Sequence, residues 1–110
     1  MKFTEFVCFE ATITELQSTE RDGVIQELVE SLAKADKLGK ASPEEVAKAV
    51  IKRENEASTG LGKGVAVPHV KHPEVCSVVA AVGQSSSGVD FAALDKKPVY
   101  SVILLISPAN

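Results

Sequence analysis

A histidine that follows three alternating glycines is the residue of this sequence best suited to chemistry. The stretch begins at Ser58 and ends at Pro68 and His69, with glycines at positions 60, 62 and 64. Glycine adopts backbone conformations that are closed to other residues, and it lets main-chain N–H groups approach a ligand closely. Imidazole changes its charge near neutral pH. Proline stiffens the backbone on both sides of its own amide bond, so the histidine side chain is pre-organised. Taken alone, the pattern favours a histidine that is packed or capped in a loop over one that attacks or holds a ligand.

Arg53 is a second candidate, because helical spacing returns it to the apolar face of its own helix. It lies seven residues after Val46 and three after Val50, so the three side chains share one stripe. This spacing fits two interpretations equally. The arginine could complement the negative end of the helix dipole, or its planar fork could bind an anion. Its position just before the glycine stretch favours the second role, beside His69.

Other motifs are excluded by their spacing. The glycines do not form G-x-G-x-x-G, and Lys63 is not followed by the Ser or Thr of a nucleotide-binding P-loop. The set of His69, His72, Cys76 and Cys8 matches no known zinc spacing. Neither cysteine lies in an electropositive loop that would make it a nucleophile. We therefore expect no metal and no cofactor.

The location of His72 and the group that orients the His69 imidazole are the next two questions. His72 precedes a proline, and we expect it on the surface. The group that orients the His69 imidazole is not identified, and Asp36, Asp90 and Asp95 are the candidates that the sequence offers.

Composition describes one ordinary globular domain of 110 residues, with 45% hydrophobic and 25% charged residues. The formal net charge is −3, which disfavours a nucleic-acid partner. Cys8 and Cys76 lie far apart in apolar segments, which favours reduced thiols in a cytoplasmic protein. No uninterrupted apolar run approaches the length of a membrane span, so we expect no membrane insertion.

The elements that must position the candidates are two helices and several strands. We predict a helix over residues 19–38, begun by a capping box at Thr19 and stopped by Gly39. A second helix is predicted over residues 42–56, with Ser42 as N-cap, Pro43 at the first position and Glu45 completing the box. Strands are predicted where apolar residues alternate over 9–14, and at the apolar runs 76–82 and 99–106. Gly83 and three serines are taken to end the second of these strands.

This order predicts an α/β fold in which helices pack on a mixed β-sheet. The strand at 99–106 is apolar on both faces, which requires cover on both. Two helices give thin cover. We therefore expect the 110 residues to be a single domain that lacks its C-terminal helices.

The motif around the histidine is similar to that of a known family. Arg53-Glu54, followed by S-T-G-L-G-K-G-V-A-V-P-H over residues 58–69, resembles the signature of enzyme IIA domains of the phosphoenolpyruvate-dependent sugar phosphotransferase system. The resemblance is to the fructose, mannitol and nitrogen-regulatory class, and it extends over essentially the whole chain. It implies a mixed sheet with helices on both faces.

The resemblance also implies a function. His69 would accept a phosphoryl group from the histidine-containing phosphocarrier protein and pass it to a IIB domain, or hold it as a regulatory signal, which would make the protein a phosphotransferase component. Arg53 would neutralise the phosphoryl oxygens. The pocket would be formed by Ser58, Thr59, Gly60, Gly62, Gly64 and Val67.

Two departures from the family pattern bear on this function. Val70 stands where the family often has a small residue, and we expect it to narrow the approach to the imidazole. Domains of the family also continue past residue 110 into helices with a second active-site histidine. The alternative function is a IIA-like regulatory module that binds a partner without being phosphorylated.

Overall fold

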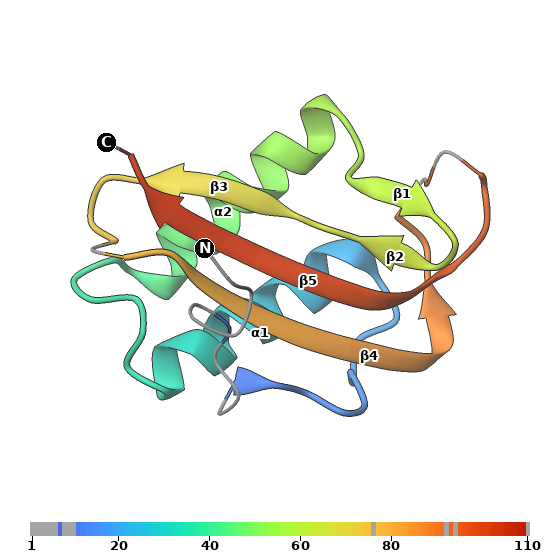
Figure 1. Ribbon diagram of the computed structural model, residues 1–110, viewed down its shortest axis with the longest axis horizontal. Coiled ribbons are helices and arrows are strands. Elements are labelled where there is room, and N and C mark those ends of the chain that lie inside the picture. Colours follow the sequence, from blue (N-terminus) through green and yellow to red (C-terminus); the bar gives the residue numbers. More distant parts are fainter. Residues whose placement is uncertain (1–6, 8–10, 76, 92, 94, 110) are drawn as a thin grey trace.

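The computed structural model describes residues 7, 11–75, 77–91, 93 and 95–109 (Figure 1). In this part of the chain, no helix is long and apolar enough to cross a membrane. The elements, in chain order, are α1 (Arg21–Lys34), α2 (Pro43–Glu56), β1 (Gly60–Gly62), β2 (Val65–Ala66), β3 (His69–His72), β4 (Val79–Val89) and β5 (Val99–Pro108).

Strand β5 is the centre of a mixed five-stranded sheet. Strands β2 and β3 follow one another along one side of β5, and both run parallel to it. On the other side, β4 runs antiparallel to β5, and β1 extends the sheet as an antiparallel neighbour of β2. The predicted α/β fold with a mixed sheet is confirmed.

Helix α2 forms where the sequence predicts it, because its start depends on local chemistry. The Ser42 side chain accepts a hydrogen bond from the main-chain N–H of Glu45, and Pro43 occupies the first helical position. Proline costs nothing there, since that N–H has no helical partner.

Helix α1 is shorter at both ends than the prediction of residues 19–38. Its N-cap is Glu20, which makes no side-chain capping bond, so the predicted capping box at Thr19 is wrong. At the other end, Asp36 takes the left-handed conformation with φ 57°, and the N–H of Lys37 reaches back to the carbonyl of Leu32. This bond pattern closes a helix as glycine usually does. Because aspartate tolerates that conformation, the helix ends before Gly39.

Strand β4 differs most from its prediction. It runs from Val79 to Val89 and continues through Gly83 and the serines that we expected to end it. A Cβ at Gly83 would lie 2.8 Å from the Leu16 side chain and 3.0 Å from that of Leu28. The glycine is therefore required by the close packing of α1 on the sheet. At the predicted first strand, Ile13 makes a single bridge to Gly83, and residues 8–10 lie outside the described part.

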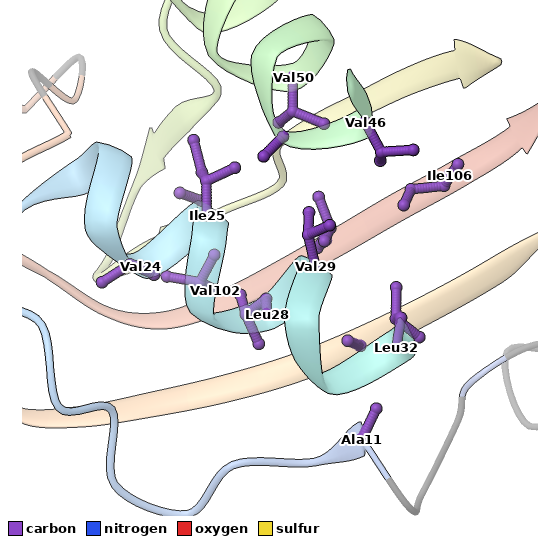
Figure 2. Close-up of a cluster of buried hydrophobic side chains, with 14 of the residues drawn as sticks. Ala11, Val24, Ile25, Leu28, Val29, Leu32, Val46, Val50, Val102 and Ile106 are labelled. Atoms are coloured by element: carbon purple, nitrogen blue, oxygen red, sulfur yellow. The ribbon is translucent and has the colours of Figure 1, made fainter. Parts of the chain in front are cut away.

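Both helices pack on the same face of the sheet, and Figure 2 shows their apolar side chains meeting those of β5. Val102, Leu104 and Ile106 of β5 point into this core and are fully buried. The alternate residues Ile103 and Leu105 belong to the other face and are half-buried. The second helical layer that we expected over this open face is not among the described elements.

Candidate functional site

The glycine stretch folds as a β-hairpin formed by β1 and β2. Gly60 pairs with Ala66 and Gly62 with Val65, and the turn between the strands has φ 57° at Lys63 and 77° at Gly64. These positive angles explain the glycine at position 64. The Gly64 carbonyl accepts the N–H groups of residues 100 and 101, which ties the turn to β5.

Asp95 holds the tip of this hairpin from the loop before β5. Its carboxylate accepts the main-chain N–H groups of Lys97 and Lys63, each at 3.1 Å. These hydrogen bonds, led by the one from Lys97, lower the pKa of Asp95 below its usual value. The side chain fixes the turn, and it does not orient His69 as the sequence allowed.

The register divides the predicted pocket residues into two groups. Thr59 lies beside Val67, because the Thr59 carbonyl accepts the Val67 N–H at 3.2 Å, and Gly60 pairs with Ala66. Thr59 is therefore the nearest of these residues to His69 in the register, and the partner of Gly60 lies three residues before His69, about 10 Å along a strand. Gly62 pairs with Val65, four residues before His69, which corresponds to about 13 Å along a strand. Gly62 and Gly64 therefore lie at the far end of the hairpin.

Ser58 is exposed, and its side chain makes two hydrogen bonds in the loop before β1. Its hydroxyl donates to the Phe91 carbonyl at 2.5 Å and accepts the Gly60 N–H at 3.1 Å. A Cβ at Gly60 would lie 2.7 Å from the Ala93 side chain, so Ala93 packs directly on this part of the hairpin.

His69 is the first residue of β3, and its side chain is exposed. It pairs with Leu105, so it stands on the open face of the sheet. Its ring nitrogen Nδ1 lies 3.0 Å from the carbonyl oxygen of Val67. Because a carbonyl oxygen only accepts, this contact is a hydrogen bond when Nδ1 carries the proton. The lone pair is then on Nε2, which makes no hydrogen bond to any described residue.

The backbone before His69 is fixed from two sides. On one side Thr59 accepts the Val67 N–H, and on the other the Pro68 carbonyl accepts the N–H of Leu105 at 2.9 Å. Pro68 itself is buried. The stiff approach that the sequence predicts is therefore reinforced by the central strand, and the group that orients the imidazole is a main-chain carbonyl.

Arg53 lies in the last turn of α2 and is half-buried. Its guanidinium makes no hydrogen bond or ion pair with the described residues, and none joins it to His69. Helix α2 packs on β3, on the face where Val70 meets the core, whereas the His69 side chain stands on the other face. The arginine keeps its five donors available for an anion.

Glu54 was missed by sequence reasoning as a site residue, although it lies four residues after Val50 on the apolar stripe. It is only 2% exposed. Its two carboxylate oxygens accept the main-chain N–H and the hydroxyl of Thr59, both at 2.8 Å. A buried acid on an apolar stripe was the signal that could have found it.

Two expectations about neighbours of His69 are wrong. His72 is 8% exposed rather than on the surface, because alternation along β3 turns it toward the helices, and its Nδ1 accepts the Glu74 N–H at 3.2 Å. Val70 also packs against the core on that side, so it does not narrow the approach to the imidazole.

Among the described residues, no three His, Cys, Asp or Glu side chains gather in a way that could hold a metal ion. Cys76 and Cys8, which the sequence offered as zinc ligands, lie outside those residues.

Comparison with known proteins relates the chain to one family. The profile of the family described as "Phosphoenolpyruvate-dependent sugar phosphotransferase system, EIIA 2" matches residues 6–110. The "PTS system fructose-specific EIIABC component" of Bacillus subtilis is 36% identical over 105 residues, which are 96% of this chain and 16% of that protein. The "Nitrogen regulatory protein" of Bradyrhizobium diazoefficiens is 32% identical over 108 residues, 98% of this chain and 69% of that protein.

A solved structure agrees with these relatives. The crystal structure of nitrogen regulatory protein IIA-Ntr from Neisseria meningitidis superposes with a TM-score of 0.87 at 28% identity, over 96% of this chain and 70% of that one. The chain thus spans about 70% of the Bradyrhizobium and Neisseria proteins and 16% of the Bacillus protein.

Proposed function

The chain belongs to the EIIA 2 family of the phosphoenolpyruvate-dependent sugar phosphotransferase system, and we propose that it carries a phosphoryl group on His69. The observation that supports this most is the contact of Nδ1 with the Val67 carbonyl, since the exposed Nε2 then holds the nucleophilic lone pair. We assign the phosphoryl group to Nε2.

In the proposed step, Nε2 attacks phosphorus in line with the nitrogen of a donor phosphohistidine. The bond from phosphorus to Nε2 forms as the bond to the donor nitrogen breaks, and the donor nitrogen keeps that electron pair. Nδ1 keeps its proton and its bond to Val67 throughout. Positioning and charge stabilisation provide the catalysis in such transfers. Arg53 supplies positive charge for the phosphoryl oxygens, and Thr59, Gly60 and Val67 form the inner wall of the pocket.

The partners belong to the proposal as well. The donor is the histidine-containing phosphocarrier protein, and the acceptor is a IIB domain or a regulated target in the cytoplasm. The name of the Bacillus relative, an EIIABC component, favours a IIB acceptor. The names of the Bradyrhizobium and Neisseria proteins favour a regulatory target. Since this chain spans 69% of the Bradyrhizobium protein and 70% of the Neisseria protein, against 16% of the Bacillus protein, we propose the regulatory use first.

We also propose that a further helical layer covers the open face of the sheet in the complete domain. The half-buried Ile103 and Leu105 support it, because a central strand of apolar residues is stable only when both faces are covered. The greater length of the Neisseria protein, of which this chain spans 70%, is consistent with such a layer.

The proposed function is tested by incubation with phosphoenolpyruvate, enzyme I and the phosphocarrier protein, followed by intact mass measurement. We expect one acid-labile phosphoryl adduct, lost in His69→Gln and retained in His72→Gln, the matched variant of the other histidine. A folded parent chain without an adduct would overturn the carrier function and favour the non-phosphorylated interaction module.

A further inference from the structure

Glu54 is a buried acid near the C-terminal end of a helix, and this position is unusual for two reasons. The side chain is only 2% exposed, and burial of a charged group is costly unless it is fully hydrogen-bonded. It also lies in the last turn of α2 (Pro43–Glu56), where the negative end of the helix dipole repels an anion. Hydrogen bonds to the Glu54 side chain are needed to offset the cost of burial and the effect of the helix dipole.

Thr59 supplies the compensation. Its main-chain N–H bonds one oxygen of Glu54 and its hydroxyl bonds the other, both at 2.8 Å. The two residues are five apart, and the chain between them leaves the helix and enters the hairpin. Glu54 therefore clamps the start of β1 to the end of α2.

From Thr59 a short series of contacts leads to the imidazole. The Thr59 carbonyl accepts the N–H of Val67 at 3.2 Å, and the Val67 carbonyl lies 3.0 Å from Nδ1 of His69. Val67 therefore makes both contacts. Its carbonyl faces Nδ1 of His69, and its N–H is bound by the Thr59 carbonyl. Thr59 and the His69 ring are thus connected through the two polar groups of Val67.

We propose that Glu54 is a positioning residue, which acts through Thr59 and Val67 to keep the His69 proton on Nδ1 and the lone pair on Nε2. The effect on phosphoryl transfer rests on the proposed function, whereas the effect on the imidazole does not. Misplacement of a nucleophile by about 1 Å lowers rates by roughly a hundredfold.

The variants are chosen to remove the contacts in steps. Glu54→Ala removes both bonds to Thr59, and Thr59→Val removes only the hydroxyl bond. Glu54→Gln keeps an acceptor for the Thr59 N–H and serves as the rescue. Glu56→Ala is the matched control, because this glutamate lies in the same turn of α2 and is exposed.

The first readout is the tautomer of His69, measured by long-range ¹H–¹⁵N NMR at about pH 8, where imidazole is neutral. We expect the parent, Glu56→Ala and Glu54→Gln to hold the proton on Nδ1, and Glu54→Ala and Thr59→Val to show a mixture with Nε2. His72 is an internal control, since its Nδ1 accepts the Glu74 N–H and its tautomer should not change.

The second readout is the rate of phosphoryl transfer in a single turnover. We expect a loss of roughly tenfold to a hundredfold in Glu54→Ala, a smaller loss in Thr59→Val and near-parent rates in Glu54→Gln. A purely structural role would lower the melting temperature without moving the tautomer.

The outcomes separate the two proposals. If folded Glu54→Ala and Thr59→Val keep the parent tautomer, the positioning role is overturned. If Glu54→Ala does not fold, Thr59→Val decides alone. If the tautomer shifts as expected but the parent takes no phosphoryl group, the positioning role stands and the carrier function fails.

Discussion

The proposed reactivity of His69 rests on one contact, between its Nδ1 and the main-chain carbonyl of Val67 two residues earlier. The residue itself was predictable, because glycines and a proline beside a histidine form a local pattern. The orienting group was not predictable, since the sequence offered three aspartates and the structure uses a main-chain carbonyl. Every residue has a main-chain carbonyl, so the sequence does not indicate which carbonyl will bind a side chain.

Arg53→Lys should slow phosphorylation of His69 by about tenfold, equivalent to about 1.4 kcal/mol in the barrier. A lysine keeps the charge but cannot bind two phosphoryl oxygens with one planar fork. Single-turnover transfer from the phosphorylated donor measures this effect. The neighbouring exposed Lys52 provides a control as Lys52→Arg, and an unchanged rate in Arg53→Lys would remove this arginine from the site.

Asp95→Asn should lower stability at pH 7 and have no effect at strongly acidic pH. The folded-state pKa of Asp95 is lowered by the N–H groups of Lys97 and Lys63, so its stabilisation is fully present above the unfolded pKa of about 3.9 and is lost as pH falls through the folded value. Thermal melts of parent and variant over that range test the sign. The exposed Glu30 gives a control as Glu30→Gln, and a difference that persists at the lowest pH would contradict the assignment.

Among the helices and strands, the boundaries that depend on neighbouring residues in the sequence were predicted correctly. The Ser42 cap and Pro43 define the start of α2 within one turn. The prediction was wrong where residues distant in the sequence determine how far an element extends. Gly83 resembles a strand stop in the sequence, yet it lies inside β4 because Leu16 and Leu28 occupy the space of a side chain. Asp36 ended α1 early by adopting a conformation usually left to glycine.

Gly83→Ala should destabilise the fold by about 1–3 kcal/mol, the usual cost of overpacking a core. The added methyl group would lie 2.8 Å from the side chain of Leu16, so helix α1 or the residues before it must shift. Urea unfolding followed by circular dichroism measures the change. Ser86→Ala in the same strand, which is exposed, should change little, and equal effects of the two substitutions would argue against close packing at Gly83.

At the scale of the whole molecule, the sheet has one covered and one open face. From the sequence we expected two helices to give only thin cover to the two faces of β5. In the structure both helices pack on the same face. The face on which the two helices pack could not be predicted, because it depends on the register of β4 and β3 against β5. The same register places His69 on the open face, beside Leu105.

Leu104→Ala and Leu105→Ala should therefore differ in cost, although the residues are neighbours. Leu104 is fully buried against the helices, and its truncation should cost about 2–5 kcal/mol. Leu105 is half-buried on the open face, and about 1 kcal/mol is expected from the smaller area that it removes from water. Paired denaturation curves provide the comparison. Equal losses would show that the open face is covered in solution.

The parallel pairing of β2 and β3 with β5 has a consequence for the order in which the protein becomes active during synthesis. The Pro68 carbonyl is held by the N–H of Leu105, a residue made 37 positions later. A nascent chain that has released His69 from the ribosome still lacks the strand that supports it. The Pro68 carbonyl therefore gains this partner only after β5 has been synthesised, so the backbone before His69 becomes fixed late in folding.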